Sequence, residues 1–264
     1  MNFVKKTIAI TFSVICLSVV ACSDDNPFSN GNSYLAEKSF SYEIEVLEQT
    51  QFVLEGIAGT ITVTGLDGFG SVKITGERRV ESFSQSDADA ELERLKVNVQ
   101  DLSEEVIVRT TQPNSTRNRN YIVDYTIRLP RDMRVVVGNV SGGVTISMIH
   151  NNVSVTSVSG NVELDDIIGS VYTGTVSGNV EGHIVLPLEG TINLGAVSGN
   201  IDLFIPQYTS ADFSASVVSG KIRLSNFVLE DIVQTENTLR GVCGEGRGTI
   251  LLGTISGNID VTGQ

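Results

Sequence analysis

Carboxylate side chains recur at one position of a repeated phrase in this sequence, where they could bind a cation or the hydroxyl groups of a sugar. The phrase has the form Val-Ser-Gly-Asn-Val, and an acid follows three successive copies: Glu163, Glu181 and Asp202. The next copy has Arg223 in place of this acid and Lys221 in place of the asparagine. Clustered carboxylates can hold Ca²⁺, and a carboxylate beside a basic group can move protons. We therefore take Glu163, Glu181, Asp202, Lys221 and Arg223 as the candidate binding residues.

These residues form a column only if successive copies of the phrase stack on one another. Thr145 and Asp260 then hold the equivalent position in the first and last copies. The simpler interpretation is a solvated acidic face that Lys221 and Arg223 relieve, because runs of charge usually face solvent. We favour this interpretation and keep a cation or sugar site as the alternative.

The sequence gives little support for enzymatic chemistry. It contains no Trp, and no aromatic residue occupies the acidic position to stack on a sugar. His150 and His183 lie almost two repeats apart in stretches that the pattern assigns to irregular connections, so we expect no shared metal or catalytic role. No nucleophile elbow, phosphate-binding loop or zinc-ligand spacing occurs. We predict a non-enzymatic protein without catalytic residues, metal or cofactor, with a polysaccharide-active enzyme as a remote alternative.

The spacing of the six phrase copies predicts the architecture. Their central glycines follow one another at intervals of 18, 18, 21, 21 and 37 residues: Gly142, Gly160, Gly178, Gly199, Gly220 and Gly257. A period near 20 residues is typical of a chain that stacks coils into a solenoid. Apolar residues upstream of each phrase alternate with polar ones, as in a strand with one buried face. We therefore predict an all-β parallel β-helix over residues 135–264, with two or three short strands per coil.

The same pattern predicts which side chains face the core. In the second copy Val158, Gly160 and Val162 are expected to face inward, and Ser159 and Asn161 outward. A third wall is expected from less regular apolar clusters at 149, 167–168, 184–186, 204–205 and 227–229. Asparagines that recur in one outward position predict a stabilising ladder between coils: Asn161, Asn179, Asn200 and Asn258.

The segments that flank the repeats predict caps for the two ends of the solenoid. Residues 39–134 form a divergent β lead-in, with one short helix that begins at Ser86 and ends near Lys96. Residues 226–248 interrupt the period, and we expect them to fold over the last coil and protect its edge. Together, residues 39–264 are predicted to form a single domain.

The beginning of the sequence predicts export and lipid anchoring. Residues 1–21 have a basic start and an apolar stretch too short to span a bilayer, as in a signal peptide. They end in Val-Val-Ala before Cys22, which resembles the lipobox of bacterial lipoproteins. That resemblance implies cleavage before Cys22 and a lipid on its side chain, whereas an ordinary cleavable signal is the alternative. Residues 22–38 are predicted to be a polar tether. We expect a protein anchored in the bacterial cell envelope, at the outer membrane, on a side that the sequence does not assign.

Charge and cysteine content narrow the choice of partners. The net charge is −13, so the surface repels nucleic acid and we predict no nucleic-acid partner. Of the three cysteines, Cys16 leaves with the signal and Cys22 is used for the lipid. Cys243 then stands alone, and the domain cannot contain an intramolecular disulfide.

Three segments resemble a known bacterial family. They are the repeated Val-Ser-Gly-Asn-Val-Glu-Leu phrase, the opening Gly-Thr-Ile-Thr-Val-Thr-Gly from residue 59, and Tyr-Thr-Ile-Arg-Leu-Pro from residue 125. From residue 39 onward the chain is similar to the putative-adhesin family of β-strand-repeat proteins. The resemblance implies a right-handed parallel β-helix, exported or attached to a membrane, with no assigned activity.

Together these observations predict an envelope lipoprotein with a rigid β-helix module for adhesion or binding. Its expected partners are the membrane, through the lipid on Cys22, and a glycan or protein ligand. The alternative is an envelope-stress or regulatory component that acts with a membrane partner, as the genomic neighbours of family relatives suggest.

Overall fold

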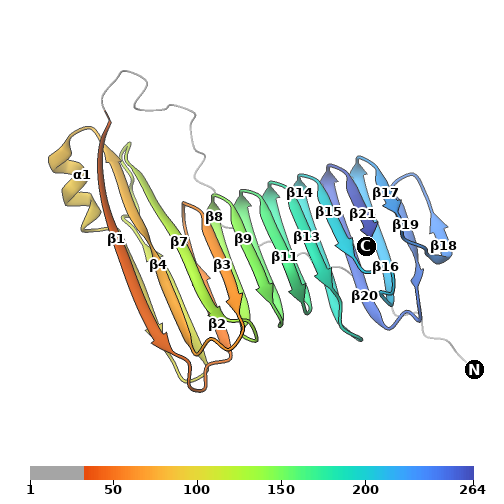
Figure 1. Ribbon diagram of the computed structural model, residues 1–264. Coiled ribbons are helices and arrows are strands. Elements are labelled where there is room, and N and C mark those ends of the chain that lie inside the picture. The colour runs from red at the N-terminus through yellow and green to blue at the C-terminus, as the bar shows by residue number, and fades with distance from the viewer. Residues whose placement is uncertain (1–32) are drawn as a thin grey trace, which may run out of the picture. The chain divides into compact units, whose positions relative to one another are not determined.

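Two β-sheets face each other across one hydrophobic core (Figure 1). The structure is a computed structural model, and it describes residues 33–264. Over that range one sheet, here called sheet A, contains ten strands, and the facing sheet B contains eleven. The fold is a mostly parallel β-solenoid with one short helix, which confirms the predicted fold class. No helix within this range is long and apolar enough to cross a membrane.

Each of the six repeat coils contributes one strand to each sheet. The strands in sheet B are β8 (Arg134–Ser141), β10 (Val153–Ser159), β12 (Val171–Ser177), β14 (Thr191–Ser198), β16 (Ala211–Ser219) and β20 (Gly248–Ser256). Those in sheet A are β9 (Val144–Ile149), β11 (Val162–Ile168), β13 (Val180–Val185), β15 (Ile201–Ile205), β17 (Ile222–Ser225) and β21 (Ile259–Gly263). Equivalent strands pair in parallel from coil to coil, which is the expected register.

The core consists of alternate side chains from the two strands of each coil. In one coil Val153 and Val155 of β10 and Val162 and Leu164 of β11 are all at most 1% exposed. Burial of each such side chain stabilises the fold by about 1.5–3 kcal/mol. The prediction of a third wall is wrong, because residues 149, 167–168, 184–185 and 204–205 form the far ends of sheet A strands, and residues 227–229 follow the last of these strands at the end of the stack. Buried members of this group are Ile149, Ile167, Ile184 and Ile205.

The Ser-Gly step of each phrase forms the corner between the sheets, and the predicted inward set is partly wrong there. Ser157 faces the core at 2% exposure, whereas Val158 faces outward. Gly160 has φ of +146°, and a Cβ on it would overlap the carbonyl oxygen of Gly142 in the neighbouring coil. The missing side chain therefore leaves room for adjacent backbone along the stack, rather than for a bend toward the core.

The asparagine ladder is confirmed, with backbone groups as its donors. The N–H of Asn179 donates to Oδ1 of Asn161 at 2.9 Å, and the N–H of Asn200 donates to Oδ1 of Asn179 at the same distance. The ladder continues from Asn258 to Asn200 at 2.8 Å and ends with the N–H of Lys221 on Asn258 at 3.0 Å. Each asparagine thus connects its coil to the next by a hydrogen bond at the corner, between the sheet B strand and the sheet A strand of the coil.

The order of the coils in space differs from their order in the sequence. β20 pairs with both β14 and β16, and β21 pairs with both β15 and β17. The coil 248–263 is therefore inserted between the coils 191–205 and 211–225 (Figure 1). The prediction that this coil ends the stack under residues 226–248 is wrong.

The N-terminal end of the stack contains a similar insertion. Its additional strands are β1 (Tyr34–Glu45), β2 (Gln51–Glu55), β3 (Ile61–Leu66), β4 (Ser71–Ser82), β5 (Lys96–Asp101), β6 (Glu105–Thr111) and β7 (Asn120–Pro130). β2 pairs with β6 and β8, and β3 pairs with β7 and β9. The coil 51–66 is thus enclosed between a coil formed later in the chain and the first repeat coil. Strand β1 begins within the stretch that the sequence assigns to the tether.

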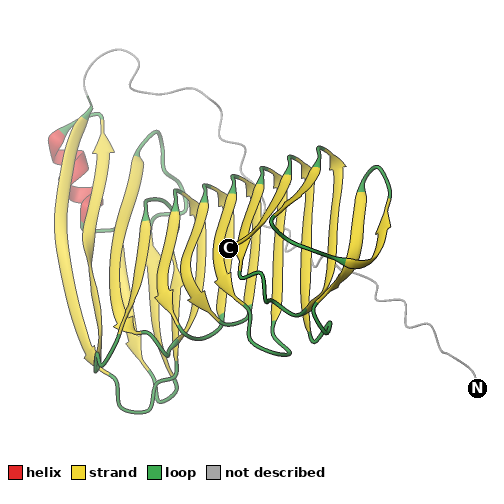
Figure 2. Ribbon diagram, turned by 45° about the vertical axis from the view of Figure 1, so that its right-hand side comes forward, coloured by secondary structure: helices red, strands yellow, loops and turns green. Residues whose placement is uncertain are grey.

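The N-terminal end is closed by long antiparallel strands and the helix. β4 pairs antiparallel with β1 and β7, and helix α1 (Gln85–Leu92) packs against β1 and β4 (Figure 2). Ser84 caps the helix by accepting from the N–H of Asp87 at 3.2 Å, so the helix starts before the predicted Ser86. Arg119 donates twice to Asp87, at 2.6 and 2.7 Å, which lowers the pKa of that carboxyl to about 2.

The C-terminal end of the stack is the coil 211–225, and a hairpin extends sheet B beyond it. β19 (Thr238–Cys243) pairs antiparallel with β16 and with β18 (Glu230–Gln234). Phe227 and Leu229 pack against the core here, whereas Val228, which was also expected to pack, is 80% exposed. In sheet A no described strand lies beyond β17, which has four residues between Lys221 and Asn226. Short length and the charges of Lys221 and Arg223 protect this edge from pairing.

Candidate functional site

The predicted acidic column exists on the outer face of sheet A. Register pairs align Thr145, Glu163, Glu181 and Asp202 on the adjacent strands β9, β11, β13 and β15. The inserted coil then places Asp260 between Asp202 and Arg223. The column therefore contains four successive acids before its basic end. The order of the repeats in the sequence predicted three. We call Glu163, Glu181, Asp202, Asp260 and Arg223 the acidic column.

Electrostatics differ along the acidic column. Nη1 of Arg223 lies 3.2 Å from both carboxylate oxygens of Asp260, so this end is neutralised by an exposed ion pair. Asp202 lies in the middle, where burial raises its pKa first and the neighbouring carboxylates of Asp260 and Glu181 raise it further. An exposed ion pair contributes little to stability. The acids are therefore held close together by the strands that carry them, against their mutual repulsion.

Two aromatic side chains beside the column were missed from the sequence. His183 and Phe204 pair in register on β13 and β15, two residues beyond Glu181 and Asp202. Their rings stack with centroids 4.3 Å apart and an interplanar angle of 9°. Nε2 of His183 lies 3.6 Å from Oε1 of Glu181. The prediction that His183 lies in an irregular connection is wrong, and extending the strand alternation by one more step would have placed it beside the acids.

The other predicted residues lie apart from this centre. Lys221 stands at the corner position of the ladder, on the terminal coil, and its backbone N–H is the last donor in that ladder. Lys221 replaces the asparagine in the coil 211–225, which lies at the end of the stack. Its position at this edge is a sufficient structural explanation for the lysine. Cys22, the predicted lipidation site, lies outside the residues that the structure describes.

Hydrogen bonding and ion pairing are the chemistry that this arrangement supports. Within residues 33–264, no group of three or more His, Cys, Asp or Glu side chains has the arrangement of a metal site. The carboxylates offer acceptors on successive strands that lie about 4.8 Å apart, Arg223 offers donors, and the His183–Phe204 pair adds apolar surface. Such a surface suits a ligand with several hydroxyl or basic groups.

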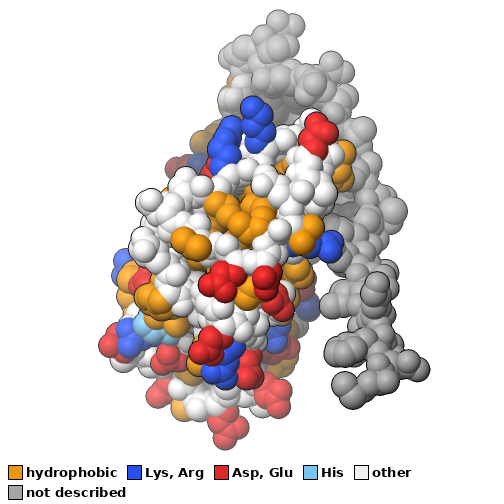
Figure 3. Space-filling view, turned by 90° about the vertical axis from the view of Figure 1, so that its right-hand side faces the viewer, with side chains coloured by type: hydrophobic (Ala, Val, Ile, Leu, Met, Phe, Trp, Pro, Cys, Tyr) orange, Lys and Arg blue, Asp and Glu red, His pale blue; other side chains and the backbone are white. Residues whose placement is uncertain are grey.

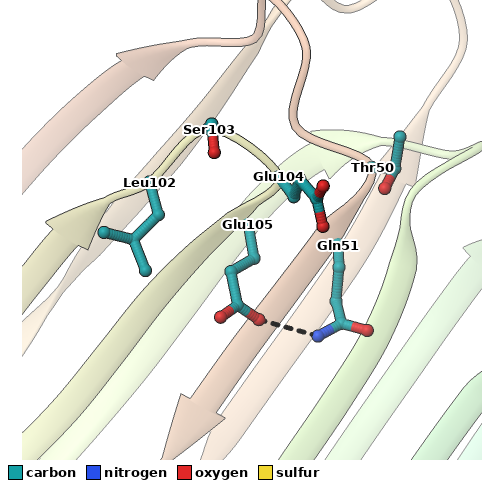
Figure 4. A pocket seen from close by; sticks show the side chains of 6 residues that line it. All are labelled: Thr50, Gln51, Leu102, Ser103, Glu104 and Glu105. Atoms are coloured by element: carbon teal, nitrogen blue, oxygen red, sulfur yellow. Dashed lines mark hydrogen bonds between the residues drawn. The ribbon is translucent and has the colours of Figure 1, made fainter.

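A surface hollow of about 310 Å³ lies at the N-terminal end of sheet B, between the start of β2 and the turn from β5 to β6 (Figure 4). The side chains around it bind one another: Nε2 of Gln51 donates to Oε2 of Glu105 at 2.8 Å. The backbone N–H of Thr50 donates to the carbonyl of Glu104 at 2.9 Å. Because these polar groups are already paired and none was a predicted site residue, we assign the hollow to turn geometry.

Replacing Asp202 with Asn is expected to stabilise the fold slightly at neutral pH. The raised pKa of Asp202 means that the folded state holds the proton more tightly than the unfolded state does. Stability therefore falls as pH rises from the usual Asp range through the raised pKa, and the carboxylate is unfavourable above it. Urea midpoints at pH 4 and pH 7 should move closer together in Asp202→Asn. Glu37→Gln, an exposed carboxylate on β1, is the control, and an equal effect there would contradict the assignment to the column.

Known proteins are similar to this chain in fold. The structure of a putative cell adhesion protein from Clostridium sporogenes matches with a TM-score of 0.50 at 13% identity, over 87% of this chain and all of the other. A putative adhesin from Bacteroides fragilis matches with a TM-score of 0.29 at 11% identity, over 85% of this chain and 97% of the other. At this identity the first match shows a shared fold alone. No curated protein matches the sequence.

The family assignment rests on a match in sequence. The model of the Toastrack DUF4097 family matches residues 43–262. That range includes the first enclosed coil, all six repeat coils and the acidic column, and it confirms the family resemblance drawn from the repeats. The chain belongs to the Toastrack DUF4097 family.

Proposed function

We propose that this protein is a non-enzymatic binding module of the bacterial cell envelope, anchored through a lipid on Cys22. Its binding face is the outer side of sheet A, where the acidic column and the His183–Phe204 pair lie. The observation that supports this proposal most is the set of four carboxylates held in register on strands β11, β13, β15 and β21. The ligand is a glycan or a protein whose hydroxyl or basic groups meet this row.

The physical argument starts from the repulsion within the column. Carboxylates at paired positions of adjacent strands, which lie about 4.8 Å apart, disfavour one another's charged forms. Burial raises the pKa of Asp202 most, and the repulsion from Asp260 and Glu181 raises it further. A ligand that donates hydrogen bonds or carries basic groups relieves the repulsion on binding. The backbone ladders fix the spacing in advance, so little conformational freedom is lost when the ligand binds.

The aromatic pair favours a glycan within this choice. The Phe204 and His183 rings stack on each other, and part of each remains accessible beside the carboxylates. Apolar ring surface next to carboxylate acceptors suits a sugar, which has an apolar C–H face and hydroxyl edges. A panel of immobilised neutral, basic and acidic polysaccharides tests this with the full-length protein.

Glu181→Gln combined with Asp202→Asn is expected to reduce retention on the polysaccharide that binds wild type at least tenfold. Gln100→Ala, an exposed change on β5, is the control and should retain full binding. Binding that survives the double substitution would refute the acidic column as the site. If the wild-type protein binds no polysaccharide and instead captures a basic protein through the column, the ligand class changes and the site stands.

Cys22→Ala is expected to release the protein from the membrane fraction or to leave its signal uncut. The reason is that a pair of acyl chains anchors a soluble domain stably, and Cys22 is the residue that would carry them. Fractionation with metabolic lipid labelling measures the result. A variant that fractionates and labels like wild type would refute lipid anchoring at Cys22. Protease added to intact cells then separates a surface adhesin, which is cleaved, from an envelope-stress component, which is protected.

A further inference from the structure

The outer faces of the two sheets differ sharply in charge. Four neighbouring strands of sheet B, namely β10, β12, β14 and β20, contain no Asp, Glu, Lys or Arg. The sheet A strands that complete the same coils each carry at least one acid. In a chain of net charge −13, this segregation leaves one broad uncharged face. We call the outer face of β8, β10, β12, β14, β20 and β16 the neutral wall.

An outward-facing row of β-branched apolar side chains crosses the neutral wall, and all of its members except the half-buried Val158 are exposed. Each of the six strands contributes its phrase residue, and together they form what we call the valine row: Val140, Val158, Val176, Val197, Ile255 and Val218. Val176 is 49% exposed, Ile255 51% and Val218 68%, whereas apolar residues on the inner face of the same strands are buried. Exposed apolar residues that line up over several adjacent strands mark an interaction surface more often than single ones do.

A row of small residues runs beside the valine row. It lies two residues earlier in each strand: Gly138, Thr156, Gly174, Gly195, Gly253 and Ser216. A Cβ built on Gly138 or Gly174 would meet no atom within 4 Å, so the space above this row is open. The neutral wall therefore has an apolar ridge beside a low strip, and these two shapes complement each other.

We propose that the neutral wall binds a second copy of this chain, sheet B against sheet B around a two-fold axis. The valine row of each copy then lies over the small-residue row of the other, as side chains interdigitate between stacked sheets about 10 Å apart. Charge selects this face: two acidic molecules repel each other through their sheet A faces, whereas the only exposed charges on the neutral wall are Arg134 on β8 and Asp212 on β16, its two outermost strands. The ligand face of the proposed function points away from this contact, so the two proposals are independent.

The size of the neutral wall fits a stable dimer. Six strands about 4.8 Å apart, each about seven residues long at roughly 3.3 Å per residue, cover a flat area of roughly 650 Å². A standard interface buries about 800 Å² on each partner, and side-chain relief raises the accessible area above the flat value. A two-fold contact over the whole wall therefore reaches the usual size.

Photo-crosslinking of the full-length protein in the membranes of cells that produce it tests the proposal. A photoreactive amino acid at position 176 or 197 is expected to give a species of twice the monomer mass. The same amino acid at position 181, on sheet A of the same coil as Val176, is the control and should give no such species. With the reactive group at position 255, the substitutions Val176→Lys and Val197→Lys should lower the double-mass yield at least tenfold. Glu181→Lys should leave it unchanged.

Each other result overturns the proposal. Absence of the double-mass species from positions 176 and 197 would show that the wall does not contact a second copy. Attachment to a molecule of different mass would assign the wall to another partner. Equal yields from positions 176 and 181 would reflect crowding in the membrane. The comparison of positions 176, 197 and 181 uses chains without the two lysine substitutions. Poor folding of the double lysine variant therefore cannot decide the result.

Discussion

A chain that stops at Arg247 is expected to lose the folded C-terminal part of the solenoid and to aggregate. Residues 248–264 supply the partners of β14 and β15 on one side and of β16 and β17 on the other. They also bury Ile250, Leu252, Ile259 and Val261 in the core. Four buried side chains correspond to about 6–12 kcal/mol, which is comparable with the whole stability of a typical domain. Sedimentation and the loss of cooperative urea unfolding measure the effect.

Deletion of residues 161–178 is the matched control, because it removes a segment of nearly the same length from the middle of the stack. It takes out one complete 18-residue period and joins Gly160 to Asn179, so the neighbouring coils can stack on each other directly. This variant should remain folded and monodisperse under the same conditions as wild type. If the chain that stops at Arg247 also unfolds cooperatively, the coil 211–225 can stack directly on the coil 191–205 and the inserted coil is not essential.

Gly178→Ala is expected to destabilise the fold by about 2–6 kcal/mol, the sum of backbone strain of about 1–3 and overpacking of about 1–3. Gly178 has φ of +146°, and a methyl group on it would overlap the carbonyl oxygen of Gly160. That carbonyl belongs to the backbone of the neighbouring coil, so no side chain can turn aside to make room. Urea unfolding of the two proteins measures the difference.

Ser177→Ala separates the corner geometry from a general sensitivity of the phrase. Ser177 is adjacent, exposed and extended, so its replacement should change stability by less than about 0.5 kcal/mol. Similar losses for both substitutions would mean that the side-chain clash is not what limits position 178. The same contrast should hold at Gly160 and Ser159, because the corner repeats in each coil.

Sequence periodicity was sufficient to predict the solenoid, the strand positions and the column of candidate residues. The glycine of each phrase has one conformation that repeats, and the asparagine after it makes one hydrogen bond that repeats. Local repeats of this kind report local geometry. Glu163, Glu181 and Asp202 therefore align on neighbouring strands as the spacing indicates.

Two errors show what periodicity cannot report. The inward residue before the corner is Asn139, Ser157 or Thr175 in the first three coils. Because these side chains are polar, the sequence pattern did not predict their burial, and Val158 was predicted to face inward instead. The position of Asp260 depends on which coils are neighbours, and the coils 191–205, 211–225 and 248–263 share the same phrase. Only the tertiary contacts of β20 and β21 decide between the possible orders.

The inserted coil sets an order of events for the assembly of the solenoid. The coil 211–225 is synthesised before residues 248–263, yet its native neighbour on the inner side is that later segment. Its place in the stack cannot be completed until the later residues arrive and add a strand to each sheet. Gln264 then closes the structure through backbone hydrogen bonds with Ile205 at 2.9 Å and Gln207 at 3.1 Å. A chain interrupted during synthesis therefore exposes an unpaired coil that proteases can recognise, and stable folding requires that residues 248–264 have been added.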